Sequence, residues 1–401
     1  MRQENDLQSR WRQTVLGIVL GLAASAVVLV LWPERTALSV AHHRGRLLSD
    51  CDGPIQDLVI HYLNDAAETI VPVYGPFLRQ LPSTVQVHVV CPSRSDFDRL
   101  AVEVGSTSCA LLPVIVNHPM TCWSRDRWLA IRVPSSGGQT DVMQLCSPRM
   151  EQAADVWLAR SGDARTAADL AAAGLGVAAK RSALFFDGGD FVADEETIFV
   201  TPRVLRHNLQ STVSNRDELV RILTKLVGRR VVLLNAAPPH HAGMFMMPVG
   251  ERTMLVGDPS AAQVLVRSVP PTEIGLPGGI DFSEETQAAF DAVAHQCQQN
   301  GYRVVRIPVA PASDGRTYLT YVNVILDDRD GRQVVYMPTF SHVPRLNEAA
   351  ASVWHSLGYQ VRPVPCDTCY QHFGSLRCLV NVLRRGRTSV GDRPKSTGDS
   401  S

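Results

Sequence analysis

The sequence lacks an excess of charge of either sign. Lys plus Arg and Asp plus Glu each number 39 in 401 residues, so the formal net charge is zero. A chain without net positive charge has no long-range field that would attract nucleic acid or an anionic membrane surface. We therefore expect no nucleic-acid partner, and selectivity has to come from a local site.

Long apolar runs are absent after the first 32 residues. Residues 14–32, TVLGIVLGLAASAVVLVLW, form a 19-residue run without a charged side chain. A run of this length can cross the hydrocarbon layer as a helix. We predict a single-pass transmembrane anchor at 14–32, and Arg10 and Arg12 favour a cytoplasmic location for residues 1–13. The globular part would then lie outside the cytoplasm.

A cleaved signal peptide is the competing interpretation of this segment. The tripeptide SVA, which ends at Ala41, has small residues at the spacing that a cleavage site requires. With cleavage the protein would be secreted rather than anchored.

The sequence also lacks a complete metal-binding motif. Nine cysteines are present, and the CDTC segment at 366–369 has no second CxxC and no close histidine pair to complete a zinc site. We expect neither a metal nor another cofactor. If eight cysteines paired in an oxidising compartment, one would remain, and Cys378 is a candidate for it. CDTC itself is compatible with a local disulfide or with two unlinked thiols.

From residue 50 onward, segments typical of strands alternate with segments typical of helices. Predicted strands include VQVHVV, ETIFVT, RVVLLN, RTMLVG, YRVVRIPV, YVNVIL, QVVYMP and YQVRPV. Three predicted helices, two of which follow Ser214 and Ser283, end at Gly228, Gly301 and Gly358, and a strand follows each. The recurrence predicts about five stacked α/β units, although an ordinary α/β sheet has the same alternation.

The predicted domain organisation follows from these patterns. Residues 33–49 are expected to be a linker, and 50–385 a single α/β domain. The Ala-rich stretch 151–181 is predicted to be a helical insertion between two core strands. The polar, Gly- and Ser-rich tail, residues 386–401, is predicted to be disordered.

Charged residues interrupt several apolar runs, where they need partners. CWSRDRW places Arg125 and Asp126 between two tryptophans, and LFFDGGDFV places Asp187 and Asp190 around two glycines. PPHHAGMFMM adds His240 and His241 before an apolar strand. Taken singly, each aspartate is as compatible with a turn or a structural ion pair as with a functional site.

The order of these motifs, followed by TYVNVIL and a terminal GSLRC, resembles that of the guanidino-group-modifying enzymes. This superfamily of pentein fold includes agmatine deiminases, arginine deiminases, peptidyl-arginine deiminases, dimethylarginine dimethylaminohydrolases and glycine amidinotransferases. The resemblance spans about residues 50–385. It implies an α/β propeller with fivefold pseudosymmetric repeats.

The resemblance also implies roles for single residues. Cys378 matches the nucleophile, His241 the general acid/base, and Asp187 a carboxylate that engages both the histidine and the guanidinium. Asp126 matches a second guanidinium-binding carboxylate. Asn323 and Gly374 match framework positions near the site. The further substrate-binding residues that we predict lie in these motifs: Trp123, Arg125, Asp190 and Asn323. We expect His240 to point elsewhere.

These residue types suit the chemistry of a guanidinium. Its central carbon becomes electrophilic when carboxylates fix the positive charge and a thiolate approaches. Hydrolysis of the resulting amidino-thioether by water is the reaction of a deiminase, and transfer to an amine that of an amidinotransferase. A papain-like hydrolase is disfavoured because Cys378 follows every histidine in the chain.

Two departures from the family pattern stand out. The family histidine is normally part of His-x-Asp, whereas His241 is followed by Ala242 and Gly243. We therefore predict a divergent site that lacks one carboxylate, and a catalytically degenerate module that binds a ligand or partner remains the alternative to an enzyme. In the second departure, Arg377 directly precedes Cys378, where it is expected to lower the pKa of the thiol.

Overall fold

The computed structural model describes residues 45–134, 141–149, 158–267, 269–270 and 274–386. The predicted segments 1–13 and 14–32, most of the linker and the tail beyond residue 386 lie outside these ranges. Within the part that is described, no helix is both long enough and apolar enough to span a membrane.

One pattern of strand pairing recurs five times. In each set a middle strand pairs antiparallel with one neighbour and parallel with the other. The sets, named with the middle strand second, are β19-β2-β3, β5-β6-β7, β8-β9-β10, β11-β12-β13 and β16-β17-β18. At least one helix links the middle strand to its parallel partner in every set. The structure therefore contains five α/β units, as the recurring helix-glycine-strand pattern predicts.

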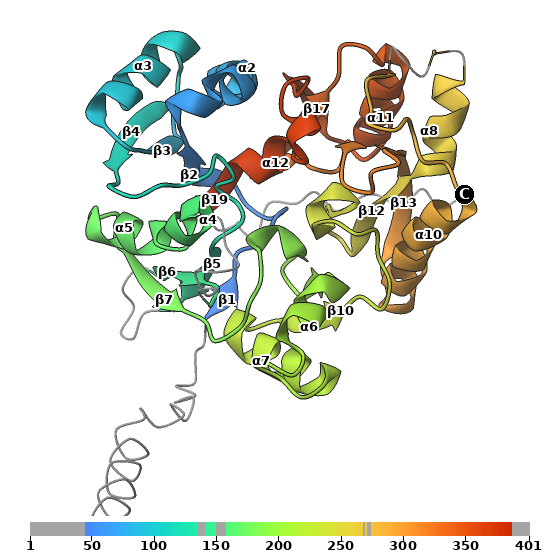
Figure 1. The fold of residues 1–401 in the computed structure, drawn as a ribbon, viewed down its shortest axis with the longest axis horizontal. Helices are drawn as coiled ribbons and strands as arrows, with labels where there is room; N and C mark the ends of the chain where they lie inside the picture. The colour runs from blue at the N-terminus through green and yellow to red at the C-terminus, as the bar shows by residue number, and fades with distance from the viewer. Residues whose placement is uncertain (1–44, 135–140, 150–157, 268, 271–273, 387–401) are drawn as a thin grey trace, which may run out of the picture. The chain divides into compact units, whose positions relative to one another are not determined.

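The first unit combines both ends of the described chain. Its strands are β19 (Val380–Arg385), β2 (Ile55–His61), β3 (Gln86–Cys91) and an additional β4 (Ala110–Ile115). Helices α2 (Ala67–Gln80) and α3 (Arg94–Val104) connect them, with the short η1 (Asn64–Ala66) before α2. Because β19 pairs with β2, the short helix α12 (Leu376–Leu379) lies beside the first unit, as Figure 1 shows in red and blue.

The second and third units contribute Arg160 and Arg203 to the pocket described below. The second contains β5 (Leu129–Val133), β6 (Val142–Ser147), α4 (Leu158–Asp163), α5 (Thr166–Ala172) and β7 (Val177–Arg181). The third contains η2 (Gly188–Asp190), β8 (Phe191–Ala193), β9 (Thr197–Val200), α6 (Pro202–Asn208), α7 (Arg216–Val227) and β10 (Arg230–Leu233).

The fourth and fifth units complete the series. The fourth contains η3 (Ala242–Met244), β11 (Met246–Pro248), β12 (Thr253–Asp258), α8 (Pro259–Val266), α10 (Glu284–Gln299) and β13 (Arg303–Pro308). The fifth contains β16 (Ile325–Arg329), β17 (Arg332–Thr339), α11 (Pro344–Ser356), β18 (Gln360–Pro365) and η4 (Tyr370–His372). A small ladder of β14 (Ala310–Pro311) and β15 (Tyr318–Leu319) lies between them in sequence.

The predicted helix ends agree with the structure at all three glycines. Gly228, Gly301 and Gly358 have φ of 63°, 84° and 85°, a conformation that glycine adopts without steric cost. Ser283 caps α10 by accepting a hydrogen bond from the Thr286 amide. In α7 the cap is Asn215 rather than Ser214, and Asn215 accepts from the Glu218 amide.

Three parts of the predicted organisation differ from the structure. The predicted linker ends too late, because β1 (Arg46–Leu47) already pairs with β5. The stretch 151–181 is not a helical insertion throughout, since its last five residues form β7, which pairs parallel with β6. In YVNVIL only Ile325 and Leu326 are strand residues. The preceding residues leave extended pairing because the buried Asn323 side chain bonds two other backbone segments.

Candidate active site

A pocket of about 660 Å³ contains the four residues that the motifs assign to catalysis and guanidinium binding. Asp126, Asp187, His241 and Cys378 all line it, although they span more than half of the sequence. Asp126 follows the first unit, Asp187 precedes η2, His241 precedes η3, and Cys378 lies in α12. The remaining lining residues are Asp65, Ala66, Thr69, Cys122, Trp123, Arg160, Arg203, Pro239, His240, Arg316, His372 and Phe373.

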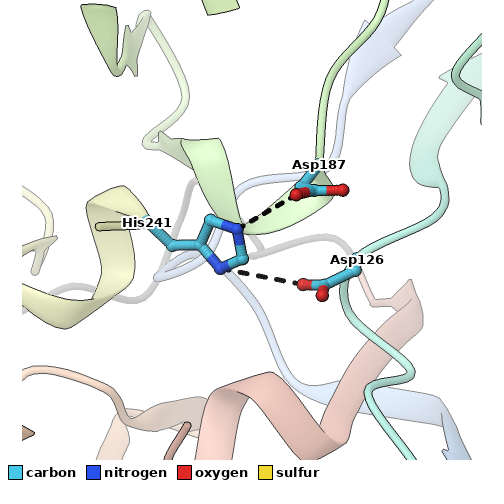
Figure 2. Close-up of side chains that lie close together, drawn as sticks. All are labelled: Asp126, Asp187 and His241. Carbon is cyan, nitrogen blue, oxygen red and sulfur yellow. Dashed lines mark hydrogen bonds and ion pairs between the residues drawn. The ribbon is translucent and has the colours of Figure 1, made fainter. Parts of the chain in front are cut away.

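The imidazole of His241 lies between two carboxylates (Figure 2). Its Nε2 is 3.3 Å from Oδ2 of Asp187, and its Nδ1 is 3.7 Å from Oδ1 of Asp126. All three side chains are buried. Figure 2 shows the ring with one nitrogen directed at each aspartate, an arrangement that favours a doubly protonated, cationic imidazole.

The electrostatics agree with this geometry. Burial lowers the pKa of His241, but the charge of Asp126 and the hydrogen bond with Asp187 outweigh it and raise the pKa well above the usual value. Burial raises the pKa of Asp187, yet the hydrogen bond with His241 and the charge of Arg160 hold it well below its usual range. The pair therefore exists as imidazolium and carboxylate near neutral pH.

Cys378 lies next to this pair. Its thiol helps to raise the pKa of His241 and approaches Oδ1 of Asn323 at 3.7 Å. The Cys378 amide donates to Ser375 O at 3.0 Å, and the Arg125 amide donates to Cys378 O at 3.3 Å. These contacts fix the backbone of Cys378, so that its thiol lies near the protonated His241. A cysteine beside a cationic histidine is in the environment of a nucleophile.

Asn323 orients the cysteine segment without lining the pocket. Its Oδ1 accepts from the Arg377 amide at 2.8 Å, while its Nδ2 donates to Gly243 O at 3.0 Å. It therefore joins the segment after His241 to the segment before Cys378. This is a positioning contact, in keeping with a framework position near the site, rather than the predicted substrate-binding contact.

Glycines in the motifs allow side chains to approach closely. A Cβ at Gly189 would lie 2.6 Å from Nδ1 of His241, and one at Gly188 would lie 2.2 Å from the Arg125 carbonyl oxygen. A Cβ at Gly374 would lie 2.3 Å from the Trp123 ring. The DGGD and GSLRC motifs therefore need glycine so that His241 and Trp123 fit against the backbone.

Arg160 is the main site residue that the sequence did not reveal. Its Nη1 donates to Oδ2 of Asp126 at 2.6 Å, and its Nη2 donates to Oδ1 of Asp187 at 2.8 Å. Arg203 also donates to Asp187, at 2.7 Å. Arg160 lies in an Ala-rich stretch whose pattern indicates only a helix, so no local signal distinguishes it from a surface arginine.

Besides Asn323, two more of the predicted substrate-binding residues, Arg125 and Asp190, do not line the pocket. Arg125 is buried on another side of its segment, where it donates to Asn381 at 2.9 Å and where burial and Arg377 lower its pKa to about 9. Asp190 is fully buried and accepts from Thr201 Oγ1 and from the Asp187 amide. Both predictions are wrong. The two charged side chains have structural roles outside the pocket, and the sequence does not show in which direction a side chain points.

The prediction that His240 points elsewhere is wrong, because His240 lines the pocket. Its Nδ1 accepts from the His241 amide at 2.7 Å, and its ring contacts that of His241 edge-on. Burial and the neighbouring His241 lower the pKa of His240 to about 3, so this imidazole stays neutral.

The remaining cysteines show no cross-links. All nine lie in the described part of the chain, and each is a free thiol. In CDTC, the Cys369 thiol contacts the Cys366 carbonyl oxygen at 3.5 Å. The structure therefore agrees with two unlinked thiols at this motif and differs from a framework of paired cysteines.

Asp126, Asp187 and His241 also form a set whose ligand atoms lie within 4.8 Å of one another, the spacing of a metal site. Arg160 already bonds one oxygen of each carboxylate, and a protonated imidazole has no lone pair for a metal. The arrangement suits a planar cation better than a divalent ion.

Neither a protein-family model nor a curated protein matches the sequence. Solved structures do match. An agmatine deiminase from C. jejuni has a TM-score of 0.65 at 14% identity, with 86% of this chain and 98% of that chain covered. A protein from Porphyromonas gingivalis described as an arginine deiminase has a TM-score of 0.62 at 19% identity, with 84% and 97% covered.

A third structure, an agmatine deiminase from Enterococcus faecalis, has a TM-score of 0.59 at 10% identity, with 84% and 95% covered. This chain has the pentein fold. The pentein fold inferred from the motif order is therefore confirmed, and its structural neighbours are named as enzymes that modify guanidino groups. At these identities the likeness establishes the fold.

Proposed function

We propose that this pentein protein is a cysteine-dependent hydrolase of a guanidino compound. The observation that carries the proposal is the convergence of Cys378, His241, Asp187 and Asp126 in one pocket. A thiol, a cationic imidazole and two carboxylates are the groups that covalent cleavage of a guanidinium requires.

The role proposed for Asp126 is to bind the substrate cation. Its Oδ1 is buried and has no hydrogen-bond partner among the described residues, while the imidazole of His241 lies 3.7 Å away. A buried carboxylate oxygen without a donor is costly, and a guanidinium N–H supplies that donor. Asp187 offers a second carboxylate on the other side of the ring.

The proposed reaction has two halves. The Cys378 sulfur adds to the guanidinium carbon, and the tetrahedral adduct collapses as His241 gives a proton to the departing amine. The product is an amidino-thioether on Cys378. Water, deprotonated by the now neutral His241, adds to the same carbon, and the carbon–sulfur bond breaks to release a ureido product and the thiolate.

Two other outcomes are tested together with hydrolysis. An acceptor amine in place of water would make the protein an amidinotransferase. The bridge from Arg160 to both carboxylates favours a third candidate, a module that binds without turnover.

The test is a panel of arginine, agmatine, methylated arginines and peptidyl-arginine. Ureido product and released amine are measured with the wild type and with Cys378→Ser. Ureido product that depends on Cys378 supports the hydrolase, and amidino transfer to an added amine supports the transferase. Inertness towards the whole panel supports the binding module.

We further propose that the five units form the closed, fivefold pseudosymmetric propeller of the family; the recurring strand pairing and the β19–β2 pairing support this. We also propose that residues 14–32 hold the protein at a membrane as a single span, with the domain outside the cytoplasm. The uncharged run supports the anchor.

A further inference from the structure

Arg160 presents a guanidinium to the same two carboxylates that a guanidino substrate needs. The two terminal nitrogens contact different aspartates, at 2.6 Å for Asp126 and 2.8 Å for Asp187. The fork of a guanidinium fits a pair of carboxylate oxygens in this way, and an incoming substrate would present the same fork. The Arg160 side chain lines the pocket and is 21% exposed.

The helix that carries Arg160 is fixed at the edge of the pocket. Asp163, at the end of α4, accepts from both the amide and the hydroxyl of Thr121, each at 2.7 Å. A Cβ at Gly162 would lie 1.5 Å from the Pro119 carbonyl oxygen, so α4 packs directly on the segment that leads to Trp123. The Arg160 side chain, rather than the helix, is therefore the part that can leave the carboxylates.

Asp187 does not depend on Arg160 for its charge balance. Arg203 donates to it at 2.7 Å, Arg127 lies 3.6 Å away, and His241 lies 3.3 Å away. Three other cations thus remain when Arg160 withdraws. The contact between Arg160 and Asp187 therefore occupies the subsite but is not needed to balance the buried charge of Asp187.

We propose that Arg160 is an internal competitor that fills the guanidinium subsite until a substrate displaces its side chain. This inference rests on the proposed function in so far as Asp126 and Asp187 are the guanidinium-binding carboxylates. It assigns to α4 a role in selectivity. A small guanidine has only its guanidinium group with which to displace Arg160. A larger substrate makes further contacts in the pocket, and these offset the free energy of displacing the Arg160 side chain.

The experiment measures binding without turnover. Calorimetry measures the dissociation constants of guanidinium chloride and of agmatine for two proteins. One is the Cys378→Ser variant, which retains Arg160, and the other carries Arg160→Ala as well. We expect Arg160→Ala to tighten binding of both probes by about tenfold or more, since the competing charge-assisted contacts are gone. Arg160→Lys keeps the charge but lacks the fork, so we expect a smaller gain.

Arg165→Ala is the matched control. Arg165 lies just after α4, is exposed, and its loss changes the net charge by the same amount. It should leave both dissociation constants unchanged. If Arg160→Ala unfolds, the Arg160→Lys comparison decides alone. Unchanged or weaker binding in the folded variants overturns the inference, and weaker binding identifies Arg160 as a substrate-binding residue.

The two proposals fail in different ways. Tighter guanidinium binding by Arg160→Ala, together with no turnover when Cys378 is intact, would sustain the internal competitor and overturn the hydrolase. If the protein with Cys378 intact turns over a guanidino compound but Arg160→Ala does not tighten guanidinium binding, the hydrolase is sustained and the internal competitor is overturned.

Discussion

Arg377 fills the space beside Gly243 that a carboxylate of the family motif would need. A Cβ at Gly243 would lie 2.8 Å from Nη1 of Arg377 and 3.4 Å from Nδ2 of Asn323. The Arg377 guanidinium is buried and donates to Asp50 at 2.8 Å and to the Phe191 carbonyl oxygen at 3.0 Å. The two departures from the family pattern therefore belong together, because the Arg377 guanidinium packs where a side chain at residue 243 would lie.

This arrangement predicts the result of Gly243→Asp. The new side chain would meet Arg377 first, so we expect no tighter binding of agmatine and a loss of stability of ~1–3 kcal/mol from overpacking. Calorimetry and denaturant unfolding measure the two effects. A tenfold gain in agmatine affinity would show that the carboxylate reaches the pocket in spite of Arg377.

The contact between Gly374 and Trp123 gives a second prediction. Gly374→Ala would place a methyl group 2.3 Å from the Trp123 ring, which has to shift, so we expect a loss of ~1–3 kcal/mol of stability and weaker ligand binding. Ser375→Ala is the matched control, because the buried Ser375 hydroxyl has no hydrogen-bond partner among the residues that the structure describes. Equal unfolding free energies for the two variants would contradict the prediction.

The raised pKa of His241 predicts how stability depends on pH. An unfolded histidine titrates near pH ~6.5, so the ion pairs of His241 stabilise the fold fully below that pH. Their contribution is lost as the pH rises through the higher folded-state pKa. We expect wild-type stability to fall over this alkaline range more steeply than that of His241→Gln in denaturant titrations. Parallel profiles would show that His241 is not charged in the fold.

The N-terminal prediction is tested by truncation. Deleting residues 1–40 leaves β1 intact, since it begins at Arg46. We expect the shortened protein to be recovered without detergent and to fractionate away from membranes. Membrane association that persists would show that another surface binds lipid and that 14–32 is not the sole attachment.

Much of the fold could be predicted because its signals are local. The glycines after α7, α10 and α11 and the serine before α10 act within one helical turn, so their sequence pattern suffices. The four central site residues were predictable because each lies in a short motif, DGGD and GSLRC among them.

What could not be predicted depends on contacts between distant segments. Asn323 leaves the expected strand because it bonds Gly243 and the Arg377 amide, 80 and 54 residues away. Arg125 turns to Asn381 instead of the pocket, and Arg160 reaches Asp126 from an unremarkable helix. Sequence alone gave the positions of these charges but not the direction of their side chains.

The most direct test of the proposed chemistry is to look for the covalent intermediate on Cys378. Intact-protein and peptide mass spectrometry after incubation with the guanidino panel should find an amidino adduct on Cys378, together with ureido product. Cys378→Ser should give neither. Ureido product without dependence on Cys378, or a folded protein that neither forms the adduct nor turns over any member of the panel, would contradict a cysteine-dependent guanidino hydrolase.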